Sequence, residues 1–195
     1  SSDPLSSRIG MVVADLRAQH PLITVDVCAR ASAGTRQALK TGEFDIGMLL
    51  GRPIDPDLTY YQLTTINCRV AGPVAWKSQI ESAGWKALAE LPWITPNGTN
   101  HTYAFMLDQL FGVRGLELNS VARFDNAALG RALVHAGVGM LLMHEEYALQ
   151  GVNDGDLALS PIAHTDCPQY IAHVTSREND PLIRAFIDAA SDAEV

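Results

Sequence analysis

Hydroxyl and amide side chains gather in four segments that each precede a helical pattern. Helix N-termini present unpaired N–H groups and a partial positive charge, so a small anion is the ligand class that these segments favour. The candidate ligand-binding residues are Ser6, Ser7, Ser32, Thr35, Asn97, Gly98, Thr99, Asn100, His101 and Asn126. For each of them, an ordinary helix cap is an equally good interpretation.

Residues 96–101 are the exception, because this loop is too long and too polar to serve as one cap, and we predict that it contacts the ligand. His101 in this loop could pair with a ligand carboxylate or titrate near pH ~6.5 as a sensor, or simply be solvated. Arg30 and Arg123 end strand-like runs beside two of the segments. Each could hold a carboxylate through two guanidinium nitrogens, or pair with a nearby aspartate.

Metal and catalytic chemistry find little support in the sequence. The six histidines and three cysteines show no His-x-x-x-His or Cys-x-x-Cys spacing, so we expect no metal. There is no Gly-x-Ser-x-Gly or phosphate loop, and Gly137-x-Gly139 leads into a strand rather than out of one. We therefore expect no catalytic residue and no cofactor. Cys28, Cys68 and Cys167 are widely spaced, and we interpret them as reduced packing residues.

The composition predicts a globular domain that does not itself bind nucleic acid. The chain has 195 residues, of which 47% are hydrophobic, enough for one large core or two small ones. No apolar run approaches the ~20 residues of a membrane helix. With a net charge of -8, the chain lacks the basic footprint expected of a nucleic-acid-binding surface, so we expect any DNA contact to lie elsewhere.

In the first part of the chain, the expected elements form a β-α-β unit. The apolar spacing from Ile9 to Leu16 predicts an amphipathic helix that ends before Pro21. We expect a strand at 23–29, a helix at 35–40 capped by Thr35, and a strand at 45–50. The apolar run of this last strand is typical of a parallel strand covered on both faces.

A second α/β unit follows the break at Gly72-Pro73. Strands are expected at 58–63 and 66–70 before the break, and at 93–94, 118–124, 138–142, 156–162 and 170–175 after it. Helices are expected at 85–91, 103–110, 127–136 with Leu129 inward, 144–150, and from Pro181 with Leu182 inward. Ligands of open α/β sheets bind at the carboxyl ends of the strands, where the four polar segments lie.

Residues 30–50 carry a recognisable pattern. The stretch from Leu39 to Leu50, with Arg30 to Thr35 before it, resembles the "G…L…L-x-x-G-x-x-D-[LI]-[GA]" stretch in the effector-binding domain of the LysR-type transcriptional regulators. Five further stretches match in the order of the family: His20-Pro21, residues 91–94, 133–140, 155–157 and 181–186. Six matches in order are far more specific than any one alone.

The resemblance implies an α/β fold of the periplasmic-binding-protein-like type 2. Two subdomains, residues 1–71 with 161–195 and residues 72–160, would be joined by two crossover strands. A small-molecule effector, an organic acid or similar, would bind in the cleft between them and modulate DNA binding and transcription. The alternative is a solute-binding protein of a transporter with the same fold. Upstream DNA-binding helices would favour the regulator, and a signal peptide would favour the transporter.

The resemblance also implies partners. We expect a cytoplasmic bacterial protein that has no membrane partner and contacts DNA only through an upstream winged helix-turn-helix absent from this chain. We expect a two-fold homodimer, and a homotetramer in the full-length protein. In the dimer, the helix of Ile9 to Leu16 and the following strand would meet the helix of residues 127–136 in the other subunit. The alternative is that these apolar stripes pack only on their own sheets.

Overall fold

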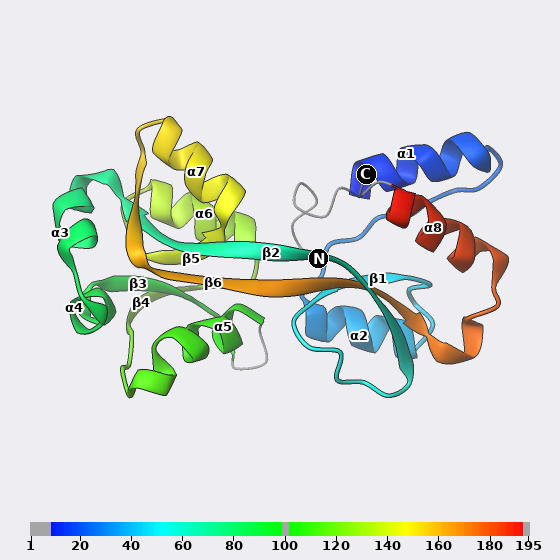
Figure 1. The fold of residues 1–195 in the computed structure, drawn as a ribbon, viewed down its shortest axis with the longest axis horizontal. Coiled ribbons are helices and arrows are strands. Elements are labelled where there is room, and N and C mark those ends of the chain that lie inside the picture. Colours follow the sequence, from blue (N-terminus) through cyan, green and yellow to red (C-terminus); the bar gives the residue numbers. More distant parts are fainter. Residues whose placement is uncertain (1–8, 99–101, 193–195) are drawn as a thin grey trace. The chain divides into compact units, whose positions relative to one another are not determined.

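The computed structural model describes residues 9–98 and 102–192 and has an α/β fold. The chain divides into two compact units, unit 1 with residues 1–65 and 168–195, and unit 2 with residues 66–167. Two long strands, β2 (Leu58–Pro73) and β6 (Leu157–Val174), belong partly to each unit (Figure 1). The expected subdomain boundaries, 71/72 and 160/161, fall within these same two strands.

The described elements of unit 1 surround the end of β6. They are α1 (Ile9–Gln19), α2 (Ser32–Lys40), β1 (Gly47–Leu50), the short 3-10 helix η3 (Thr175–Arg177) and α8 (Pro181–Asp192). On one face of β6, Ile171 packs with Leu16 of α1 and Phe186 of α8. On the other, Ala172 packs with Leu39 of α2. Successive residues of a strand point to opposite faces, so this sheet has a core on both sides.

Two expectations for unit 1 are wrong. Residues 23–29 form no strand, and β1 pairs antiparallel with β6, with Gly47 opposite Ala172, rather than parallel. The predicted β-α-β unit is therefore not formed in the described part of the chain. The apolar run at 47–50 correctly indicated a strand buried on both faces, but burial carries no information about the direction of the neighbouring strand.

The described elements of unit 2 surround a parallel pair of strands. They are the 3-10 helix η1 (Val74–Trp76), α3 (Lys77–Ser82), α4 (Trp85–Glu90), β3 (Pro92–Pro96), α5 (Thr102–Leu110), the 3-10 helix η2 (Gly112–Arg114), β4 (Asn119–Phe124), α6 (Ala127–His135), β5 (Leu141–His144) and α7 (Glu145–Asn153). β3 pairs parallel with β4, and Trp93 of β3 bridges to Met140 just before β5. β5 in turn pairs antiparallel with β2.

Two long strands were each predicted as two separate short strands. The strands expected at 58–63 and 66–70 are parts of β2, and those at 156–162 and 170–175 are parts of β6. The strand expected at 138–142 is assigned at 141–144. The sequence predicted breaks at residues 64–65 and 163–169, but β2 and β6, which are neighbours in one sheet, each continue through them.

Two helical residues expected inside the core point outward. Leu129 of α6 is 56% exposed and Leu182 of α8 is 55% exposed. In α6 the inward position next to Leu129 belongs to Gly130, where an added Cβ would touch Leu141 and Phe124 at 3.3–3.4 Å. The helix therefore packs closely on the sheet through its glycine, which rotates Leu129 to the surface.

Candidate functional site

Ser32 joins the N-terminus of α2 to the end of β1, and Thr35 lies one turn further along the helix. The Ser32 Oγ accepts a hydrogen bond from the Leu50 N–H at 3.0 Å, and both residues are buried. The helix begins at Ser32, after Ala31. The prediction that Thr35 caps the helix is therefore wrong, because Thr35 lies inside it. As ligand contacts, Ser32 and Thr35 remain predictions.

Arg30, next to this helix, is already engaged by the protein. Its two terminal nitrogens donate to the two carboxylate oxygens of Glu43, and its guanidinium lies 4.9 Å from the centre of the Phe44 ring. Of the two roles open to Arg30, the structure shows pairing with a protein carboxylate, although the partner is a glutamate rather than the expected aspartate.

Gln169 is a polar residue that the sequence reasoning missed. It lies opposite Leu50, the last residue of β1, and is fully buried. Within residues 9–98 and 102–192, neither its amide oxygen nor its amide nitrogen has a hydrogen-bond partner. The one signal in the sequence that could have pointed to Gln169 was a single amide side chain among apolar residues of a strand. Buried amides are normally bonded, so Gln169 carries unused hydrogen-bonding capacity at the carboxyl end of β1.

In unit 2 the candidate residues lie where β3 and β4 end. The Asn97 N–H donates to the Phe124 carbonyl at 2.6 Å, and Gly98 has a φ of 76°. The Asn126 Oδ1 accepts the Ala128 N–H at 2.8 Å, so this side chain caps α6. The parallel pairing of β3 with β4 brings these two ends together. Ser6, Ser7, Thr99, Asn100 and His101 lie outside the described residues.

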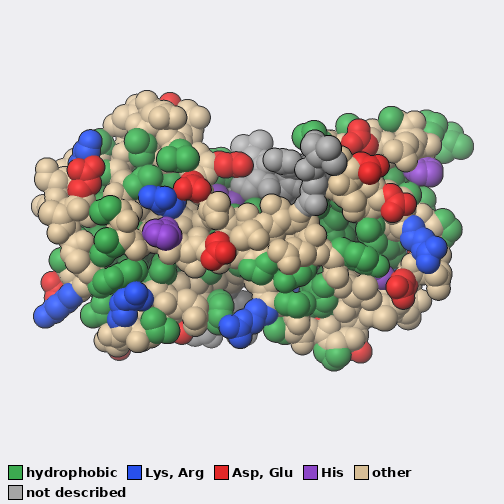
Figure 2. All heavy atoms as spheres, in the orientation of Figure 1, with side chains coloured by type: hydrophobic (Ala, Val, Ile, Leu, Met, Phe, Trp, Pro, Cys, Tyr) green, Lys and Arg blue, Asp and Glu red, His purple; other side chains and the backbone are tan. Residues whose placement is uncertain are grey.

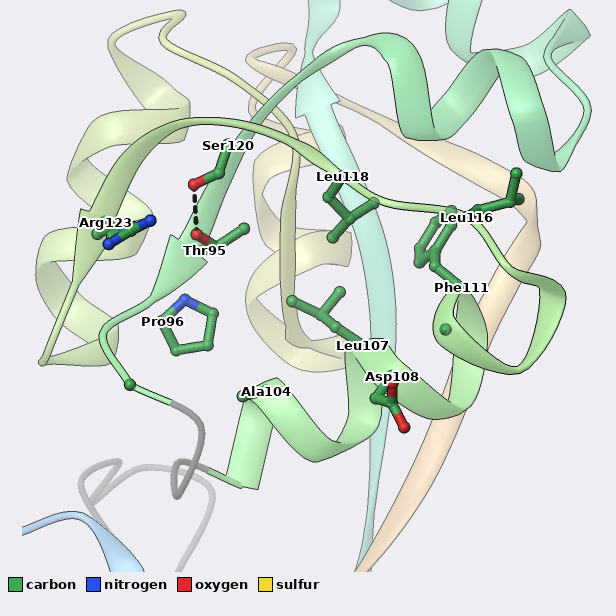
Figure 3. A pocket seen from close by; sticks show the side chains of 12 residues that line it. Thr95, Pro96, Ala104, Leu107, Asp108, Phe111, Leu116, Leu118, Ser120 and Arg123 are labelled. Carbon is green, nitrogen blue, oxygen red and sulfur yellow. Dashed lines mark hydrogen bonds between the residues drawn. The ribbon is translucent and has the colours of Figure 1, made fainter.

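A cavity of about 400 Å³ lies in unit 2 beside α5 and the ends of β3 and β4 (Figure 3). Leu107, Phe111 and Leu118 are among its apolar lining residues. At one end the hydroxyls of Thr95 and Ser120 are hydrogen-bonded to each other at 2.6 Å. The Arg123 side chain lies at the same end, and Asp108 lies across the cavity from it. Residues 95 and 120 are too far apart in the chain for sequence reasoning to have joined them.

Charge is dispersed over the face of the molecule drawn in Figure 2. On the face drawn in Figure 2, lysine and arginine side chains lie singly among acidic and apolar ones. Among the described residues, no group of three or more histidine, cysteine or carboxylate side chains is arranged to hold a metal. The helices of the described ranges are all too short or too polar to span a bilayer.

Comparisons with known proteins identify the architecture. The family model of the LysR substrate binding domain matches residues 1–194. The effector-binding domain of QuiR in complex with shikimate is similar, with a TM-score of 0.80, 17% identity, and coverage of 95% of this chain and 89% of that one. The CcmR regulatory domain of Synechocystis PCC6803 in complex with 2-PG is also similar. Its TM-score is 0.78 and its sequence identity 15%, and the match covers 96% of this chain and 91% of that one.

A full-length regulator is also similar. CbnR in complex with its target DNA has a TM-score of 0.71 and 15% identity, with coverage of 97% of this chain but only 66% of CbnR. No curated protein matches the chain. At these identities the solved structures establish the fold, which is the expected periplasmic-binding-protein-like type 2 fold.

Proposed function

Because the chain belongs to the LysR substrate-binding domain family, we propose that it is the effector-sensing part of a LysR-type transcriptional regulator. The observation that carries this proposal is the match of the family model to residues 1–194. The domain binds a small molecule and is not an enzyme. Full-length CbnR is complexed with its target DNA, and this chain spans 66% of the length of CbnR. In this proposal, DNA binding by the whole protein belongs to a part outside this chain.

The effector is a small anionic metabolite, an organic acid or similar. QuiR binds shikimate and CcmR binds 2-PG, which supports this ligand class. The strand ends of each unit support it as well, since α2 and α6 begin there with polar residues at their N-termini, and helix N-termini favour anions. The contribution of Ser6, Ser7, Thr99, Asn100 and His101, and the position of the effector between the subdomains, remain predictions.

A solute-binding protein with the same fold is the second candidate, and the family match favours the regulator over it. The regulator acts in the cytoplasm as a homodimer and, in full length, as a homotetramer. Exposed apolar side chains support the dimer. Met11 and Leu22, within and after α1, and Leu129 of α6 are exposed, and these are the segments that the family resemblance brings together across a two-fold axis.

A thermal-shift screen tests the effector proposal. Small carboxylates, aromatic acids, amino acids and neutral sugars are compared at equal concentration, because a ligand that binds only the folded state raises the melting temperature. We expect stabilisation by one or more acids. Thr99→Ala and Asn100→Ala should weaken the effect of that acid more than they destabilise the fold, for which a lost cap costs ~1 kcal/mol. Stabilisation by neutral sugars alone would contradict the proposal.

A further inference from the structure

We propose that the segment of residues 23–29 in one copy of this chain pairs, backbone to backbone, with the outer edge of β4 in a second copy. The contact rests on the homodimer proposed above and adds an intermolecular β-sheet to it. In a two-fold dimer the contact is made twice, because each copy offers both edges to the other. It involves no effector.

Residues 23–29 lie between α1 and α2 as a drawn-out stretch without helix or turn (Figure 1). Their sequence, Ile-Thr-Val-Asp-Val-Cys-Ala, is rich in the β-branched residues that strands favour. Ile23 and Val25 pack against the apolar cluster of α1, α8 and β6, which holds the segment in place. The backbone of residues 24–29, however, makes no hydrogen bond to any described residue. A row of unpaired N–H and C=O groups is the feature to which a further strand adds.

The outer edge of β4 is the other half of the contact. Among the described residues, β4 pairs with β3 on one side and with no strand on the other. Val121, in the middle of β4, is an apolar side chain with 52% exposure. Soluble proteins commonly guard free strand edges with lysine or proline, but neither residues 23–29 nor β4 contains a lysine or a proline. Both edges are therefore open to another strand.

Charge favours the pairing of unlike edges over self-pairing. Asp26 is the one charged residue of residues 23–29, and Arg123 is the one charged residue of β4. Both are exposed, and within the described ranges neither takes part in an ion pair, whereas Arg30 pairs with Glu43. Two copies of residues 23–29 paired about their centre would set Asp26 against Asp26. Opposite charges across a strand pair stabilise it and like charges destabilise it, so Asp26 opposite Arg123 is the favoured arrangement.

The two edges adjoin the helices already proposed for the dimer. Residues 23–29 follow α1, where Met11 is exposed, and β4 precedes α6, where Leu129 is exposed. One strand pair alone buries too little area to hold a stable dimer. The helices therefore supply the apolar area, while the strand pair supplies main-chain hydrogen bonds and fixes the register of the two copies.

Charge reversal tests the pair of Asp26 with Arg123. Asp26→Arg and Arg123→Asp each set like charges against each other and should weaken the dimer about 2- to 30-fold, the range for a cross-strand charge pair that occurs twice. The double variant restores opposite charges and should regain most of the parental affinity. Glu146→Arg, at an exposed carboxylate of α7, changes the net charge as Asp26→Arg does and should leave the dimer unchanged. A double variant as weak as the two single effects combined would overturn the proposed pairing.

Amide hydrogen exchange on the chain without effector tests the backbone contact directly. The parent at tens of micromolar is compared with the Leu129→Glu variant, which we expect to be monomeric. Residues 24–29 and β4 should exchange at least ~10-fold more slowly in the dimer, and α7 should exchange equally in both.

The outcomes separate the strand pair from the dimer itself. Fast exchange of residues 24–29 in a dimeric parent would overturn the strand pair and leave the homodimer standing, whereas a monomeric parent would overturn both. Slow exchange of residues 24–29 that persists in the monomer would show that the same chain supplies the partner, and this too would overturn the proposal. Failure of the effector screen would leave these results unaffected.

Discussion

The Ser32 hydroxyl accepts the N–H of Leu50, the last residue of β1, and so joins the start of α2 to the end of the strand. Ser32→Ala removes this buried hydrogen bond, which should lower the free energy of unfolding by ~1 kcal/mol. Urea denaturation measures the change. Ser82→Ala removes an exposed hydroxyl bonded to Ser78 and should stay within ~0.5 kcal/mol of the parent. Equal losses for both variants would show that the Ser32 bond is not special.

Gln169→Met should make the unliganded domain more stable. The amide of Gln169 is buried and has no partner among the described residues, and burying an unbonded amide costs ~1–3 kcal/mol by mutational measures. Methionine keeps a similar length without the polar atoms. The melting temperature should rise, whereas Gln150→Met, at an exposed residue of α7 bonded to Asp154, should change it little. A fall in the melting temperature of Gln169→Met would indicate that the amide is satisfied in solution.

Gly139 is a position where a side chain does not fit. A Cβ there would lie 2.8 Å from the Pro92 carbonyl oxygen, and this backbone atom belongs to the neighbouring strand β3 and cannot move away easily. We expect Gly139→Ala to destabilise the domain by ~1–3 kcal/mol. A Cβ added at Gly10 in α1 meets no atom of the described residues within 4 Å, so Gly10→Ala should stabilise the domain by ~0.5–1 kcal/mol. Urea denaturation of both variants at one protein concentration tests this contrast in sign.

The three cysteines differ in reactivity. Cys28 is exposed, contrary to its expected packing role, while Cys68 and Cys167 are buried. Burial raises the pKa of the Cys68 thiol, and Cys167 adds to this effect, so little reactive thiolate forms there. A colorimetric thiol reagent at pH ~8 should label one thiol per native chain and three in urea. Cys28→Ser should abolish the native reaction; rapid labelling of a second thiol would contradict the burial of Cys68 and Cys167.

The proposed dimer predicts that a charge on α6 separates the subunits. Leu129 is 56% exposed, and Ala132 on the same helix is also exposed, whereas Val12 of α1 is buried and unsuitable. Leu129→Glu should convert dimer to monomer without loss of helical circular dichroism, since burying an unpaired carboxylate in an interface is costly. Leu149→Glu, on α7, is the matched control and should remain dimeric. Analytical ultracentrifugation at tens of micromolar measures the oligomeric state of the parent and of both variants. A monomeric parent domain would contradict the proposed interface.

Local features of this protein were determined by the sequence itself. Gly42 takes the left-handed conformation that ends α2, and Asp180 with Pro181 begins α8, where the Leu182 N–H is bonded to the Asp180 carboxylate. These features depend on a few neighbouring residues and on conformations that few amino acids adopt. The family resemblance, and with it the fold, was also readable because six short stretches occur in order along the chain.

Only the tertiary structure decided the features that depend on distant residues. The direction of β1 is set by β6, more than a hundred residues later, and the outward position of Leu129 by the close contact of Gly130 with Leu141. The cavity joins Thr95 to Ser120 and Arg123 through the pairing of β3 with β4. Hydrophobic periodicity reports burial within one element. It does not report which strand or side chain the fold places opposite, because that choice is made by packing between elements.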